Sequence, residues 1–159
     1  MPIFNNSIPS ATAGTTTNDN ATAGNVGEFV TSMVAAGAAV ALTTATGKNV
    51  TSMSLTAGDW DVSGQVDFVL SGVTATLFQS GISLTTNTLP AQVGGSGLGT
   101  DALVGVPLLT TVLSATYCQG IAPVRISLAI TTTVYLVAQA AFSAGTNAAY
   151  GTLRARRVR

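Results

Sequence analysis

The chain has 159 residues, of which 47% are hydrophobic and only 8% are charged. Soluble domains average about 25% charged residues, so a lone monomer would have too few charges to cover its surface in the usual way. We therefore expect much of that surface to be buried against other chains. Six basic and six acidic residues cancel, and without a net field we expect neither nucleic acid nor an anionic membrane as a partner.

The chain also lacks the side chains that most catalytic and metal sites need. It has no histidine and a single cysteine, Cys118, which excludes an internal disulfide, a Cys/His zinc cluster and a histidine general base. Serine and threonine are plentiful, but no histidine is present to activate one as a nucleophile. We therefore expect no enzymatic activity and no cofactor, and we expect Cys118 to be a buried structural thiol.

Residues 1–26 are rich in Asn, Thr, Ala and Gly, and their main bulky apolar side chains are Ile3, Phe4 and Ile8. Such a segment cannot bury enough surface to fold alone. It is either a disordered arm or, in the interpretation we favour, an extended arm that becomes ordered on a neighbouring subunit, with these three side chains as anchors. The first residues show no basic and apolar regions of a secretory signal, which predicts synthesis in a cytoplasm.

The folded domain is expected at residues 27–159, where the pattern changes to strands and turns. Three segments rich in β-branched and apolar residues predict strands at 28–34, 39–44 and 49–56. Residues 35–41 are expected to be strand or loop, because a glycine and β-branched flanks disfavour a helix. The long uncharged stretches are interrupted by Thr, Ser, Gly and Pro, so we expect no membrane-spanning helix.

Residues 59–70 show the clearest period of two in the chain. The apolar residues Trp60, Val62, Val66, Phe68 and Leu70 share one parity with Gly64, and the polar residues Asp59, Asp61, Ser63, Gln65 and Asp67 share the other. Side chains alternate between the two faces of a strand, so this pattern predicts a central, half-buried strand. We expect Trp60 and Phe68 on its buried face and the three aspartates on a solvated face.

Residues 74–79 and 82–86 predict two further strands divided at Ser80-Gly81. Residues 87–107 hold five glycines and two prolines, which predicts a long loop. The run Gly-Gly-Ser-Gly-Leu-Gly at 94–99 resembles a phosphate-binding loop only superficially, because the Walker lysine is absent. A surface loop that contacts a partner is the better interpretation.

The last third of the chain predicts strands at 108–118, 124–130, 134–142 and 149–158. Roughly eight strands with turns every eight to twelve residues, and no amphipathic helix, are typical of a β-sandwich or jelly roll. The fold class predicted from the sequence is therefore all-β, a jelly-roll-like β-sandwich of about eight strands with an extended N-terminal arm.

Two groups of charged residues are candidate sites. Asp59 and Asp61 lie about 6.6 Å apart along a strand, but Asp67 is far from both, so the carboxylates do not converge. A solvated face is the favoured interpretation, ahead of a cation site. The other group is the C-terminal cluster of Arg154, Arg156, Arg157 and Arg159. It is either a docking tail for an acidic surface or nucleic acid or, more simply, a charged end that protects an edge strand from further pairing.

Three stretches of the sequence resemble small structural proteins of tailed bacteriophages. They read Ser54-Leu-Thr-Ala-Gly-Asp-Trp-Asp-Val-Ser-Gly64, Thr131-Thr-Thr-Val-Tyr-Leu-Val-Ala-Gln-Ala140 and Gly151-Thr-Leu-Arg-Ala-Arg-Arg-Val-Arg159. The resemblance spans about residues 27–159 and implies a trimer-forming jelly roll that serves as a head decoration (cement) protein or as the tip domain of a tail fibre or spike. The matched stretches describe a strand framework and no catalytic site.

Together these features predict a non-enzymatic virion protein. The leading hypothesis is a homotrimeric capsid decoration protein on the capsid exterior, made in the host bacterial cytoplasm, that bridges subunits of the major capsid protein. Its candidate interface residues are Ile3, Phe4, Ile8, Arg154, Arg156, Arg157 and Arg159. The alternative is a receptor-binding tip domain whose loop at 94–99 contacts cell-surface carbohydrate.

Overall fold

The computed structural model describes residues 17–90, 102–113 and 115–159. These residues form nine strands and one 3-10 turn, η1 (Ala36–Ala38). The strands are β1 (Phe29–Val34), β2 (Val40–Ala41), β3 (Lys48–Leu55), β4 (Gly58–Ser71), β5 (Val73–Ser83), β6 (Leu103–Leu113), β7 (Thr116–Leu128), β8 (Thr132–Phe142) and β9 (Thr146–Arg157).

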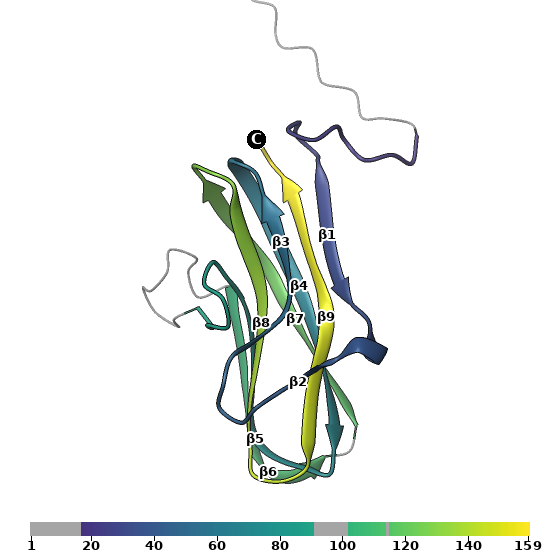
Figure 1. Ribbon diagram of the computed structural model, residues 1–159, viewed down its shortest axis with the longest axis vertical. Helices are drawn as coiled ribbons and strands as arrows, with labels where there is room; N and C mark the ends of the chain where they lie inside the picture. The colour runs from purple at the N-terminus through teal and green to yellow at the C-terminus, as the bar shows by residue number, and fades with distance from the viewer. Residues whose placement is uncertain (1–16, 91–101, 114) are drawn as a thin grey trace, which may run out of the picture.

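The strands form two antiparallel sheets that lie face to face along the long axis of the domain (Figure 1). Sheet A has the order β1-β9-β4-β7, with the short β2 also paired to β9, and sheet B has the order β3-β8-β5-β6. Apart from β2, the first strand therefore pairs with the last, the second with the second-last, and so on inward. This arrangement of one long hairpin wound into two sheets is a jelly roll, so the predicted fold class is confirmed.

The core lies between the sheets, and β4 supplies its largest side chains. Trp60 and Phe68 are fully buried, as the alternation along this strand predicts. Phe68 meets Phe78 of sheet B with ring centroids 4.8 Å apart, and Phe78 lies 5.4 Å from Tyr117 of β7. This aromatic group joins the two sheets.

Three boundaries predicted from the sequence are wrong. The predicted break at Ser80-Gly81 is absent, because β5 continues through it. Gly81 is a packing position and not a turn: a Cβ there would lie 2.7 Å from Cδ of Pro90 and 3.0 Å from the carbonyl oxygen of Ala102. The predicted strand at 108–118 is divided between β6 and β7, and the predicted loop at 87–107 overlaps the start of β6.

The first part of the domain also differs from the prediction. The strand expected at 39–44 is reduced to the two residues of β2, and η1 precedes it where strand or loop was expected. β7 contains Pro123 and continues through it, because β7 is an edge strand and its pairing with β4 shifts register between Val124 and Ile121, and proline is tolerated at edges and at such irregularities. In the part of the chain that the structure describes, no helix has the length and apolar character needed to cross a membrane.

Candidate assembly surface

The outer face of sheet A carries a row of charged and aromatic side chains that cross four strands. Phe29 of β1 lies opposite Arg156 of β9, Arg156 lies opposite Asp61 of β4, and Asp61 lies opposite Arg125 of β7. Side chains opposite one another in an antiparallel sheet have Cβ atoms about 5 Å apart. The register thus places residues that are up to 127 positions apart in the sequence, Phe29 and Arg156, next to one another.

An open depression of about 210 Å³ lies on this face. It is lined by Phe29, Asp61, Ser63, Pro123, Arg154, Ala155 and Arg156. Ala155 points its side chain into the core and is buried, so it contributes backbone to the floor, while Phe29 and Pro123 are apolar side chains from the two edge strands. We call this feature the arginine depression.

The C-terminal arginines divide into two pairs by parity. Arg154 and Arg156 are exposed on the outer face of β9, as their shared parity predicts, and both line the arginine depression. Among the described residues, the ion pairs involve Arg125, Arg157 and Arg159 but neither Arg154 nor Arg156. These two guanidinium groups are therefore available to bind a partner.

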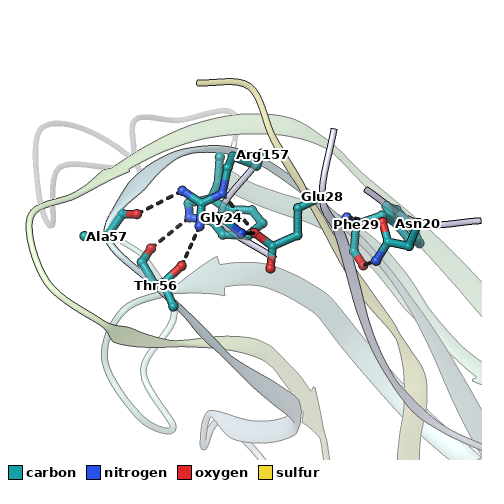
Figure 2. Close-up of polar contacts among 8 residues, drawn as sticks. Asn20, Gly24, Glu28, Phe29, Thr56, Ala57 and Arg157 are labelled. Atoms are coloured by element: carbon teal, nitrogen blue, oxygen red, sulfur yellow. Dashed lines mark hydrogen bonds and ion pairs between the residues drawn. The ribbon is translucent and has the colours of Figure 1, made fainter. Parts of the chain in front are cut away.

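Arg157 points the opposite way, into the end of the sandwich, and its place in the predicted docking cluster is wrong. Only 5% of its side chain is exposed, and its Nε donates to Oε2 of Glu28 at 2.9 Å. Its Nη1 donates to the carbonyl oxygen of Ala57 at 2.9 Å, and its Nη2 donates to Oγ1 of Thr56 (Figure 2). The guanidinium also lies 4.3 Å from the centroid of the Trp60 ring, a cation–π geometry.

Gly58 leaves room for this buried guanidinium. A Cβ at Gly58 would overlap Nη1 of Arg157, and the backbone there has φ of +137°, a conformation that other L-residues rarely adopt. Glycine is therefore required at this position both by its backbone conformation and by its neighbour.

The segment before β1 is held to the body by side chains as well as backbone. Asn20 brackets the edge of β1: its Nδ2 donates to the carbonyl oxygen of Phe29 at 2.7 Å, and its Oδ1 accepts from the Phe29 amide at 2.8 Å (Figure 2). Oε2 of Glu28 accepts from the Gly24 amide at 2.8 Å. This backbone hydrogen bond, followed by the Arg157 interaction, lowers the pKa of Glu28 despite the opposing effect of burial.

The aspartates of β4 do not form one solvated face. Asp61 is exposed, but Asp59 is buried because two arginines cover it. Arg125 binds Asp59 in a bidentate manner, with Nη2 to Oδ2 at 2.5 Å and Nε to Oδ1 at 3.2 Å, and Arg159 binds the same Oδ2. The described residues contain no group of three acidic or cysteine side chains that could hold a metal ion, and Asp59 already has its cationic partners.

Cys118 is exposed, so the expectation of a buried structural thiol is wrong. It lies opposite Asp67 on the outer face of sheet A, while its neighbour Gln119 points inward and accepts a 2.8 Å hydrogen bond from Ser80. Partial burial, followed by the hydrogen bond and negative charge of Asp67, raises the pKa of the Cys118 thiol.

The structure shows two contacts that the sequence pattern did not predict, the Glu28–Arg157 ion pair and the hydrogen bonds of Asn20 to Phe29. A signal for the pair was present. Glu28 has the same parity as the inward Val30, and Arg157 has the same parity as the inward Leu153 and Ala155. Both charged side chains are therefore expected to point into the sandwich. A charged side chain that points inward needs a partner of opposite charge. No local pattern indicates the hydrogen bonds of Asn20. Ile3, Phe4, Ile8 and the glycine run at 94–99 lie outside the described residues.

No family model and no curated protein matches the sequence. Among solved structures, the chain is similar to a structure of the Gx strain of infectious bursal disease virus, with 14% identity and a TM-score of 0.47 over 82% of this chain and 32% of that one. It is also similar to the VP2 subviral particle of the same virus, with 14% identity and a TM-score of 0.43 over 82% of this chain and 30% of that one. The chain spans about a third of the length of these structures. The assignment of the jelly roll rests on the strand order and not on these similarities, whose sequence identities and TM-scores are low.

Proposed function

We propose that this chain is a non-enzymatic virion structural protein, and specifically a homotrimeric capsid decoration protein that bridges major capsid subunits of a tailed bacteriophage from the outside. The observation that carries the proposal is the outer face of edge strand β1. Phe29 and Met33 are 45% and 68% exposed there, beside two arginines without ion pairs in the described part of the chain.

Such a surface is typical of an assembly protein. Large exposed apolar side chains are normal when scattered, but here one of them lines an open depression together with Arg154 and Arg156, and aromatic and arginine side chains are enriched where proteins meet. The chain has only 8% charged residues, which supports extensive burial against other subunits. The sequence resemblance to phage virion proteins is the reason for proposing a tailed-phage capsid as the assembly.

Copy number is the decisive measurement. Purified virions are to be analysed by quantitative mass spectrometry, with this chain measured against the major capsid protein. A decoration protein is expected in many copies, in a fixed ratio to the capsid subunit. A few copies per particle would contradict decoration and favour the receptor-binding tip, for which purified protein would then be tested for binding to the carbohydrate of host cells.

The trimer is tested by the mass of the purified protein in solution. Light scattering after size-exclusion chromatography is expected to give three times the chain mass at micromolar concentration. A well-folded monomer at that concentration would refute the trimer, because obligate interfaces commonly bury above about 2,000 Å² and do not dissociate at this dilution.

We also propose that residues 1–26 act as an attachment arm, with Ile3, Phe4 and Ile8 as anchors. Burial of one such side chain contributes roughly 1.5–3 kcal/mol before the cost of ordering the chain, and three arms in a trimer reinforce one another by avidity. Deletion of residues 1–16 removes the anchors and leaves Asn20 and Gly24 in place. Reduced occupancy on capsids assembled without this protein is expected, and unchanged occupancy would refute the attachment role.

A further inference from the structure

The arginine depression has a charge that the protein itself does not neutralise. Arg154, Arg156 and Asp61 are its charged lining residues, so it carries a net charge of +1. Asp61 lies between Arg156 and Arg125 in the register, so its negative charge offsets part of the positive potential of these arginines. It forms no ion pair in the described part of the chain. An anionic group is the natural complement of such a surface.

The spacing of the two guanidinium groups indicates how that anionic group is presented. Arg154 and Arg156 are two positions apart on one face of β9, and neighbouring positions of this kind lie about 6.6 Å apart along a strand. Carboxylates two residues apart in an extended partner segment have the same spacing. Arginine is suited to this task because its planar fork binds a carboxylate through two hydrogen bonds.

The rest of the lining adds an apolar contact to the charge. Phe29 and Pro123 come from opposite edges of the sheet, and Phe29 is 45% exposed. A partner segment that runs along β9 with its carboxylates on the arginines would lie beside Phe29, which is opposite Arg156 on the neighbouring strand β1.

A second copy of this chain is a poorer complement. Of its acidic side chains that the structure describes, Asp19 already makes an interaction within the chain, and Glu28 and Asp59 are engaged by arginines. Asp61 and Asp67 lie on the same outer face as Arg154 and Arg156, where only a face-to-face pairing of two copies could use them.

We infer that the arginine depression docks an extended acidic segment of the capsid partner, with carboxylates at alternate positions bound by Arg154 and Arg156. The inference rests on the proposed function and names the surface and the chemistry through which this chain binds its capsid. It makes the site heterotypic, and the contact between copies of the trimer must then lie elsewhere.

The test measures binding of purified protein to capsids assembled from the major capsid protein alone, by co-sedimentation over a range of protein concentrations. Arg154→Gln and Arg156→Gln are each expected to weaken binding by about fivefold. Lys48→Gln, which removes the same charge from an edge of sheet B, is the matched control and should bind as the wild type does. Asp61→Asn removes the one negative charge of the depression and should tighten binding by about twofold.

A synthetic extended peptide with glutamate at every second position provides an independent measurement. It should displace the wild-type protein from the capsids, whereas the same peptide with glutamine should not. Raised salt should weaken wild-type binding more than it weakens binding of the Arg154→Gln/Arg156→Gln double variant.

The possible failures are distinct. If the wild type binds capsids and the arginine variants bind equally well, the inference is wrong and the proposed function stands. If the arginine variants lose the trimer and the control does not, the occupant is a second copy and the inference is again wrong. If the wild type does not bind capsids at all, the proposed function fails and the inference fails with it.

Discussion

Replacement of Arg157 by methionine tests whether the buried ion pair closes this end of the jelly roll. Methionine keeps much of the length of the side chain but removes every hydrogen bond of the guanidinium. Glu28 would keep the Gly24 amide as its donor, and the Ala57 carbonyl and the Thr56 hydroxyl would lose theirs.

The expected cost follows from the burial of both partners. Breaking a buried ion pair by removing one partner typically costs 3–5 kcal/mol. The side chains of Arg157 and Glu28 are 5% and 12% exposed, so water can reach the remaining carboxylate in part, and we expect about 3 kcal/mol, near the lower end of that range. The loss includes the cation–π contact with Trp60, because the guanidinium lies over its ring.

The assay is chemical denaturation followed by circular dichroism at neutral pH, with a double-mutant cycle as the control. Adding Glu28→Gln to Arg157→Met should recover roughly 1 kcal/mol relative to Arg157→Met alone, because an unpaired buried carboxylate is removed. A cost below about 1 kcal/mol for Arg157→Met, or no recovery in the double variant, would refute the argument that this pair holds the segment before β1.

The same pair predicts how stability depends on pH. The pKa of Glu28 is lower in the folded protein than its ordinary value of 4.5, so the unfolded chain binds the proton more readily. The stabilisation is therefore fully present above pH 4.5 and is lost as the pH falls through the lowered pKa of the folded state. Glu28→Gln should flatten the acid limb of the stability curve, measured as the free energy of unfolding between neutral and acidic pH, and an unchanged acid limb would contradict this role.

Three other outcomes are expected. Trp60→Ala should cost about 3–5 kcal/mol in thermal melting and Asp61→Asn should stay within about 0.5 kcal/mol, and equal effects would contradict the assignment of the two faces of β4. Alkylation of Cys118 by iodoacetamide at mildly alkaline pH should be slow because its thiol pKa is raised, and Asp67→Asn should accelerate it; an unchanged rate would exclude Asp67 as a cause. Deletion of residues 1–16 should leave the melting temperature almost unchanged, and a large decrease would show that this segment stabilises the folded body.

The sequence predicted those parts of the fold that depend on local alternation. Alternation between the two faces is a property of a single strand, so it can be predicted without knowing the partner strands. It correctly placed Trp60 and Phe68 on one face of β4, and Arg154 and Arg156 on one face of β9. The fold class followed for the same reason, because many short strands without an amphipathic helix leave few architectures.

The errors arose where a distant residue decides the local structure. The dipeptide Ser80-Gly81 is typical of a turn, yet Pro90 and Ala102 pack against Gly81 within β5. Asp59 has the parity of an exposed residue, yet arginines 66 and 100 positions away cover it. Such cases depend on register and on the packing of the two sheets, and the sequence alone contains neither.

The pairing of the first and last strands joins the two parts of the proposed function in space. Residues 17–28 and the C-terminus lie at the same end of the sandwich (Figure 1), and the segment that leads into β1 reaches the arginine depression at Phe29. An arm bound to the capsid would therefore hold the depression close to the same partner, which raises the effective concentration of the second contact. Loss of either contact alone should then weaken attachment only in part, whereas loss of both should release the protein.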